Sequence, residues 1–261
     1  MERSNINEVV RNQFNKQADQ FSNWSVTQNK EYMKRYFAAC EMTPEDSLLD
    51  VACGSGEFAI FSAPQIKSAA GVDISDRMIE LARLNAIQRN ISNITFLCHD
   101  IASIPLEDKS FSIVTCKSAF HHVYDYDNVM NEMIRCCENG GKISMQDIVA
   151  YQNDRVNDFF EQLEQQIDIS HHVSLSKQFF QKLFEAHNLA ATRTFELTVE
   201  LNFKEYLNHA VQSEKCSTEM ERLLKNGLHD PEISGFFAVK GGELYFKRNV
   251  FVIIGRKLLF V

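Results

Sequence analysis

The sequence predicts an α/β fold with a Rossmann-like, doubly wound sheet, and three observations support this prediction. Short apolar segments alternate with amphipathic ones between residues 47 and 149. The first apolar segment ends in a glycine-rich turn, Gly54-Ser55-Gly56, that leads into a helical pattern. The chain has 261 residues, 44% of them hydrophobic, which suffices for one domain with its own core. Alternating strands and helices predict a mostly parallel sheet covered on both faces.

The N-terminal half carries most of the expected elements. Residues 6–20 and 28–41 have the apolar spacing of helices, for example at Tyr32, Tyr36 and Phe37. Alternating strands and helices then build the expected parallel core. In chain order they are strand Ser47–Ala52, helix Glu57–Gln65, strand Ala69–Asp73, helix Asp76–Arg89, strand Ile94–Cys98, strand Phe111–Cys116, helix Asp127–Cys137 and strand Lys142–Val149.

The pattern changes after residue 150. Residues 154–168 and 176–187 are expected to be helical, and Thr192–Leu201 and Arg248–Gly255 are expected to be strands. We predict that these last two strands form a hairpin that extends the sheet. The polar segment between them, roughly 203–240, is predicted to cap the ligand site.

The predicted organisation is a single domain over residues 1–261. Residues 1–45 are expected to form a helical lid, residues 46–150 the cofactor-binding core, and residues 151–261 the remaining strands and the cap. A mostly aromatic stripe stands at helical spacing in the cap, at Phe203, Tyr206, Leu207 and His209. Such a stripe is first of all a packing face, and it would also wall a substrate pocket if the cap covers the open end of the sheet.

Charge excludes one class of substrate. The formal net charge is −8 and the sequence pI is about 5.5, so the surface repels phosphate backbones and a nucleic-acid substrate is not expected. The densest basic stretch pairs Lys247–Arg248 with Arg256–Lys257. Because these pairs flank an expected strand, we interpret them as its solvated ends.

The cysteines and the N-terminus predict a reducing, cytoplasmic location. The 7 cysteines form no metal-binding spacing and no disulfide framework, so neither a metal nor a disulfide is expected. Residues 1–5 are polar and lack the features of a signal peptide, and no apolar run is long enough for a membrane span. The oligomeric state does not follow from the sequence.

The glycine-rich turn predicts a nucleotide-like ligand. Glycines let the backbone turn sharply and approach a ligand, and ligands of open α/β sheets bind beyond the carboxyl ends of the strands. Gly54 to Ala59 also matches the G-x-G-x-x-A spacing of dinucleotide-binding proteins. The turn alone therefore leaves both NAD and S-adenosylmethionine (SAM) open.

Acidic residues at three successive strand ends favour SAM. Asp50 precedes the turn, where a carboxylate suits the ammonium of a methionine moiety, and Asp73 can accept both ribose hydroxyls. Asp100 can accept from an adenine amine, with Ile74 and Ile101 on either side of the ring. Each acid alone has a plain structural interpretation as a loop or helix cap. Capping alone does not readily explain why acids follow three successive strands.

With these residues in view, the sequence resembles the class I SAM-dependent methyltransferases of the ubiquinone/menaquinone-biosynthesis-like group. The opening helix is similar at Phe14, Gln17 and Phe21, and the resemblance covers about residues 8–150. The stretches that carry it are Leu48–Gly56, Gly71–Met78, His99–Pro105, Asp108–Val114 and Ser118–Val123. One departure is Ala52, where many members carry glycine.

The resemblance implies a seven-stranded sheet, mostly parallel with a reversed final strand, and a role for each matching position. Gly54 and Gly56 would lie under the methionine part of SAM, Asp73 at the ribose, and Asp100 with Ile101 at the adenine. The loop from Lys117 to His122 would face the methyl sulfonium. The other implied cofactor-binding residues are Phe14, Gln17 and Phe21, which would close over the cofactor, Tyr32, which would reach its carboxylate, and Asp50, Ala52, Ile74 and Met78.

Methyl transfer needs few catalytic side chains. The sulfonium is already a good leaving group, so the enzyme mainly aligns the donor and acceptor and excludes water. A general base helps only when the acceptor must lose a proton. The candidates are His121 and His122, which point apart as neighbours, and Tyr124. Asp147, near the end of the fifth expected strand, is predicted to face the same rim, where we expect it to be a buried, hydrogen-bonded acid.

A second histidine pair, His171 and His172, raises the question of a metal. Its spacing matches no known metal motif, so we expect one of the two to lie in the substrate pocket or at the start of the following helix instead.

The leading interpretation is a SAM-dependent methyltransferase that acts on a small molecule of unknown identity, which we expect to be neutral or apolar. One alternative is an NAD-linked oxidoreductase, which would leave Asp100 without a role. Another is a non-catalytic module that binds SAM and regulates a partner. Binding of SAM, of NAD, and of an acceptor separates the three.

Overall fold

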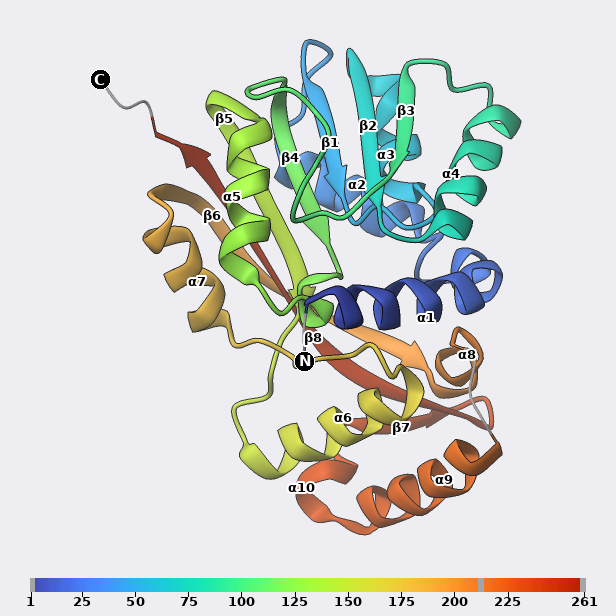
Figure 1. Cartoon of the computed structure of the whole chain (residues 1–261). Coiled ribbons are helices and arrows are strands. Elements are labelled where there is room, and N and C mark those ends of the chain that lie inside the picture. Colours follow the sequence, from blue (N-terminus) through green and yellow to red (C-terminus); the bar gives the residue numbers. More distant parts are fainter. Residues whose placement is uncertain (1–2, 211–213, 259–261) are drawn as a thin grey trace.

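A mixed sheet organises the molecule. The computed structural model describes residues 3–210 and 214–258, and within these ranges the strands form one eight-stranded sheet with helices on both faces (Figure 1). The sheet has the order β3-β2-β1-β4-β5-β8-β6, and β7 pairs with β8 off this path. The strand bounds are β1 Ser47–Val51, β2 Ser68–Asp73, β3 Ile94–Cys98, β4 Phe111–Lys117, β5 Cys137–Ile148, β6 Leu189–Asn202, β7 Phe237–Lys240 and β8 Glu243–Lys257.

The predicted parallel half is confirmed. Strands β1 to β5 pair in parallel, with β2 on one side of β1 and β4 on the other. The chain adds β2 and β3 on one side of β1 and then crosses over to add β4 on the other side. Open α/β sheets form their ligand crevice where the strand order reverses in this way. The α-helices are α1 Arg3–Asn23, α2 Lys30–Ala39, α3 Glu57–Ser62, α4 Asp76–Gln88, α5 Tyr126–Cys136, α6 Asp154–Ile167, α7 Lys177–Ala186, α8 Phe203–Asn208, α9 Glu214–His229 and α10 Pro231–Ser234.

Side-chain caps explain where several helices begin. Asn29, Ser75, Asn153 and Ser176 each accept a backbone N–H of the first turn, of α2, α4, α6 and α7 respectively. Such caps satisfy N–H groups that the helix itself leaves unpaired. Helix α3 begins differently, at Gly56 with φ of 78° and no side-chain cap.

The antiparallel half agrees with the prediction in part. Strands β6 and β8 pair antiparallel and extend the sheet as expected, with β8 between β5 and β6, but β8 begins at Glu243 instead of Arg248. The segment expected as a helical cap also contains β7, an eighth strand that forms a tight hairpin with β8. Gly241 and Gly242 make that turn with φ of 59° and 83°, which is the conformation that two-residue hairpins require.

The core has one layer on each face of the sheet. Helices α5 and α7 pack on one face through residues such as Met133 and Phe180, and α2 and α3 pack on the other through Tyr36 and Phe58. A separate cluster joins α6 to α8, α10, β7 and β8, around Phe160. In Figure 1 the elements α6, α10 and β7 lie beyond the ends of β1 to β4, and α1 runs between these elements and those strands.

Gly71 marks a close approach between β2 and its neighbours. A Cβ at this position would lie 2.7 Å from Cys53 Sγ and 2.7 Å from the Phe96 ring. We expect Gly71→Ala to lower the free energy of unfolding by about 1–3 kcal/mol, because extra volume in a packed core forces its neighbours to move. Urea denaturation measures this change. Gly235→Ala is the matched control, because nothing lies within 4 Å of the added methyl; an equal loss in both variants would contradict the steric explanation.

Among the described residues, no helix combines the length and apolarity that crossing a membrane requires.

Candidate cofactor and acceptor site

One cavity of about 680 Å³ lies where the strands end, and it has two parts. The part that we call the parallel end is lined from the ends of β1 to β4, by Asp50, Gly54, Asp73, Asp100 and Lys117. The part that we call the antiparallel end is lined from β5, β6 and β8, by Gln146, Ile148, Val199, Leu201, Arg248 and Val250. The volume of the whole cavity falls within the range typical of small-molecule sites.

The carboxylates predicted at the strand ends come together at the parallel end. Asp73 is 8% exposed, and its two oxygens accept the N–H groups of Gly54 at 2.8 Å and Ser75 at 2.9 Å. Asp50 is buried and accepts the Thr115 hydroxyl at 2.8 Å. Burial raises the pKa of Asp50 to about 6, which the Thr115 hydrogen bond opposes. A cationic ligand group would relieve this cost of burying a carboxylate.

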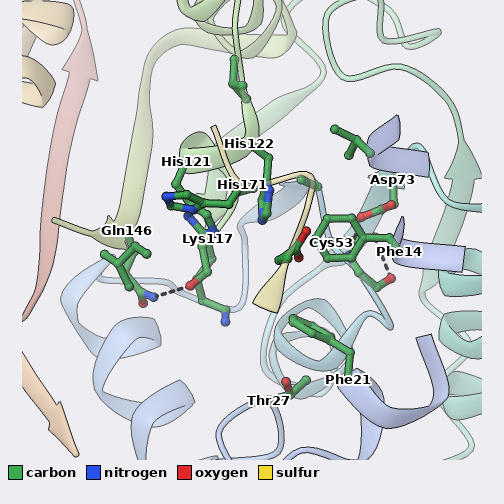
Figure 2. A pocket seen from close by; sticks show the side chains of 18 of the residues that line it. Phe14, Phe21, Thr27, Cys53, Asp73, Lys117, His121, His122, Gln146 and His171 are labelled. Carbon is green, nitrogen blue, oxygen red and sulfur yellow. Dashed lines mark hydrogen bonds between the residues drawn. The ribbon is translucent and has the colours of Figure 1, made fainter. Parts of the chain in front are cut away.

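Helix α1 covers the parallel end. Asn7 donates to Asp100 at 2.8 Å, and Asn15 accepts from the Ser75 hydroxyl at 2.6 Å. Phe14 and Phe21 line the cavity from the same helix, and Figure 2 shows both rings directed into it.

The sequence-predicted cofactor residues divide into two groups. Those that line the cavity are Phe14, Phe21, Tyr32, Asp50, Ala52, Gly54, Asp73, Ile74, Asp100, Ile101, Lys117 and His122. Gln17, Gly56 and Met78 do not line it. Gln17 is fully buried and donates to Asp168 at 3.2 Å, and Met78 is fully buried in α4, so their effect on a ligand would be indirect.

Three histidines meet between the two ends of the cavity. His121, His122 and His171 all line it, with ring centroids 4.1 Å apart for His121–His122 and 5.5 Å apart for His121–His171 (Figure 2). His121 Nδ1 lies 2.6 Å from the carboxylate of Asp147, which is 2% exposed. With Nδ1–H donated to Asp147, the Nε2 of His121 is the nitrogen that accepts a proton. No group of three or more His, Cys, Asp or Glu in the described ranges is arranged to hold a metal ion.

The two adjacent histidines have opposite electrostatic settings. Burial lowers the pKa of His121, but the charge and hydrogen bond of Asp147 outweigh it, so the net shift is upward. His122 has no such partner; burial and the charge of His121 lower its pKa to about 4. Its Nδ1 lies 3.0 Å from the carbonyl oxygen of Ser170.

NMR titration should show that the pKa values of His121 and His122 are shifted in opposite directions. We expect His121 to ionise above the usual value of about 6.5 and His122 below it. The unfolded chain then protonates His122 at a pH where the folded chain does not, so stability falls as the pH drops from about 6.5 towards 4. The contribution of His121 has the opposite sign: it is present below about 6.5 and is lost as the pH rises through its raised pKa.

Asp147→Asn should bring the pKa of His121 down and leave His172, on the outer rim, unchanged. Equal pKa values for His121 and His122 in the wild type would contradict the assignment.

Tyr124 and His172 lie on the outer rim. Tyr124 lines the cavity but is 48% exposed, and its ring stacks on His172 with centroids 3.7 Å apart. Of the second histidine pair, His171 therefore faces the cavity and His172 does not line it.

The antiparallel end contains a buried ion pair. Arg248 is 1% exposed, and its Nη2 lies 3.3 Å from Glu164 Oε1 and 3.2 Å from the Ser174 hydroxyl. The Tyr206 hydroxyl donates to the other Glu164 oxygen. Our interpretation of Lys247–Arg248 as a solvated strand end is therefore wrong for Arg248. The strand is longer than predicted, which places Arg248 inside it with its side chain towards α6.

An aromatic contact between the α1–α2 turn and the end of α8 forms part of the cavity wall. Trp24, in the turn after α1, stacks on His209 with ring centroids 4.3 Å apart and 17° between the planes. Ser25 also hydrogen-bonds Glu205, so the α1–α2 turn contacts α8 twice. The predicted stripe in residues 203–209 does wall the cavity, through Tyr206 and His209.

Buried polar atoms without a hydrogen-bond partner concentrate at this cavity. Within the described ranges, such side-chain atoms are Tyr32 Oη, Ser55 Oγ, Gln146 Oε1, Arg248 Nε and Arg248 Nη1. All four side chains line the cavity. Because buried polar groups are normally paired, a group of unpaired ones around one cavity indicates a ligand that supplies the partners.

The residues that sequence reasoning missed are Trp24, Gln146, Glu164, Asp168 and Arg248. The one available signal was an arginine between Phe246 and Val250, inside a segment that is otherwise compatible with a buried strand. Its partner Glu164 comes from a distant helix, and no local pattern connects the two.

Comparisons with known proteins agree with this geometry. A family model for a methyltransferase domain matches residues 43–188. The chain is 28% identical over 177 residues to the uncharacterized methyltransferase YcgJ of Bacillus subtilis, an alignment that covers 68% of this chain and 70% of that protein. It is 29% identical over 122 residues to a demethylmenaquinone methyltransferase of Shouchella clausii, over 46% of this chain and 52% of that enzyme.

A solved structure shows the same fold. A candidate methyltransferase of Bacillus halodurans superimposes with a TM-score of 0.79 and 22% identity, over 88% of this chain and 100% of that one.

Proposed function

Because this chain belongs to the family of methyltransferase domains, we propose that it transfers a methyl group from SAM to a small-molecule acceptor. The observation that carries the proposal is the single cavity that joins three strand-end carboxylates to a histidine–carboxylate pair. The first group suits the donor, and the second suits an acceptor that must lose a proton.

The residues at the parallel end fit SAM. Asp50 and Asp73 are buried carboxylates that line the cavity, and Ser55 has a buried hydroxyl without a partner. We assign Asp73 to the ribose hydroxyls, Asp50 to the ammonium group, and Asp100 with Ile101 to the adenine. Lys117, at the end of β4, is the cation on this side and would balance the carboxylate of the methionine part.

When bound, SAM supplies an electrophilic methyl group on a sulfonium that leaves readily. The chain must then hold the acceptor in line with that methyl and exclude water. We propose that α1 and α2 act as the lid, and that α8 with the rest of residues 203–240 acts as the cap; residues 211–213 of that segment lie outside the described ranges.

We propose His121 as the general base. Asp147 fixes the Nδ1–H tautomer, so Nε2 is the nitrogen that takes the acceptor proton. The raised pKa of His121 makes it the stronger base of the two neighbours, whereas His122, with a pKa of about 4, acts as a neutral hydrogen-bonding wall. Tyr124 is too exposed to hold a proton away from water and is placed at the entrance.

Calorimetry with SAM, S-adenosylhomocysteine and NAD tests the proposal. We expect micromolar binding of the first two and none of NAD. Folded protein that binds neither SAM nor its product would overturn the proposal, and NAD binding in the same experiment would support an oxidoreductase instead. Incubation with methyl-labelled SAM and a small-molecule extract then separates an enzyme from a binding module, because only an enzyme moves the label to a new compound.

A further inference from the structure

We propose that Arg248 is a specificity-determining residue that binds an uncharged oxygen, such as a ketone or amide carbonyl, at the end of the acceptor far from the methylated atom. This inference rests on the proposed methyltransferase function, since it names the class of acceptor for that site.

The first argument is the unsatisfied guanidinium. A buried arginine normally uses most of its five N–H donors, often in a bidentate pair with a carboxylate. Here Glu164 Oε1 lies 3.3 Å from Nη2, and the second oxygen of Glu164 accepts the Tyr206 hydroxyl. Nε and Nη1 are left without a hydrogen-bond partner among the described residues. An oxygen that accepts hydrogen bonds is the group that would complete the arginine.

The second argument is that the guanidinium is held in place. Its central carbon lies 5.3 Å from the centre of the Tyr151 ring and 5.4 Å from that of Phe160. The Ser174 hydroxyl and Glu164 hold Nη2. A donor fixed in this way binds a ligand oxygen without losing much side-chain freedom.

The third argument concerns charge. Glu164 already neutralises the guanidinium, and Asp168 adds a second carboxylate to the cavity wall. A carboxylate or phosphate on the acceptor would meet this surplus of negative charge, whereas a carbonyl oxygen accepts hydrogen bonds without it. The charge distribution therefore favours a neutral oxygen.

The register of the sheet separates Arg248 from the proposed base. Asp147, the partner of His121, lies opposite Phe251, and Arg248 is three residues from Phe251 along β8. At about 3.3 Å per residue, the two backbone levels are about 10 Å apart. Ile148, Val199 and Val250 line the cavity on this antiparallel side, so the middle of the acceptor is apolar.

Three matched phenols test the inference on protein loaded with S-adenosylhomocysteine. The probes are 4-(4-hydroxyphenyl)butan-2-one, which has the ketone, 4-butylphenol, which lacks it, and 3-(4-hydroxyphenyl)propanoate, which replaces it with a carboxylate. Calorimetry should show the ketone binding about tenfold more tightly than 4-butylphenol, as expected for hydrogen bonds to a charged donor. The carboxylate should bind no better than 4-butylphenol.

Two variants connect the preference to Arg248. Arg248→Met with Glu164→Gln removes both charges together and should abolish the advantage of the ketone. Glu164→Gln alone leaves the guanidinium without its counter-charge and should raise the affinity for the carboxylate about tenfold. Retained binding of S-adenosylhomocysteine shows in each case that the protein is folded.

The outcomes are distinct. A ketone that binds no better than 4-butylphenol, or an advantage that survives in the double variant, would overturn the role of Arg248 and leave the methyltransferase proposal intact. Loss of S-adenosylhomocysteine binding in the wild type would instead overturn the proposed function itself.

Discussion

Replacing Asp73 by alanine is expected to weaken the binding of S-adenosylhomocysteine at least about 100-fold. In the proposed assignment, the carboxylate accepts both ribose hydroxyls, and each hydrogen bond to a charged group contributes about 1.5–3 kcal/mol. Asp73 also accepts the N–H of Gly54 at 2.8 Å and of Ser75 at 2.9 Å, so the substitution loosens the turn that the ligand rests on. Titration calorimetry measures the change.

The control for this prediction is another carboxylate. Asp108 is 68% exposed, pairs with Arg135 and lies away from the cavity lining, so Asp108→Ala should bind the ligand like the wild type. Asp73→Asn should fall between the two, because one amide oxygen can still accept a hydrogen bond. Equal affinity for Asp73→Ala and wild type would remove Asp73 from the site.

Replacing Arg248 by methionine is expected to lower the free energy of unfolding by about 3–5 kcal/mol. The substitution leaves Glu164 as a buried charge that keeps only the Tyr206 hydroxyl, and a buried charge without its partner is strongly destabilising. Urea denaturation at neutral pH measures the loss.

The matched variant is Arg248→Met combined with Glu164→Gln. A buried ion pair that is removed as a whole costs little, so this double variant should recover most of the stability. If the double variant is as unstable as Arg248→Met alone, the loss comes from packing of the arginine against Tyr151 and Phe160 and not from the uncompensated charge.

Local patterns predicted the parallel half because each signal there lies within one short segment. The strand that carries Asp50, the turn at Gly54 and the strand that ends at Asp73 are all visible within a few dozen residues, and parallel pairing brings the ends of the strands together. The positions of Asp50, Asp73 and Asp100 on one cavity follow from that topology.

The acceptor side could not be predicted in the same way. Strand β7 has only four residues, Phe237–Lys240, within a segment that is mostly helical and polar. Four residues are too few to show the two-residue alternation of a strand. The pairs Arg248–Glu164 and Gln17–Asp168 join elements far apart in the chain. His121 and Asp147 were recognised separately, but only the fold shows that they form a hydrogen-bonded pair at 2.6 Å.

The position of β8 also sets the order in which the strands of the sheet can pair during translation. Strands β1 to β5 are complete once Ile148 has been synthesised, and the residues that define the parallel end all precede it in the chain. Strand β6 pairs only with β8 on the path of the sheet, and β8 ends at Lys257. The nascent chain therefore has the elements of the parallel end early, while β6 lacks its partner β8 until α8, α9, α10 and β7 have been synthesised. Among the described strands, those that line the antiparallel end of the cavity are therefore the last to find all their partners.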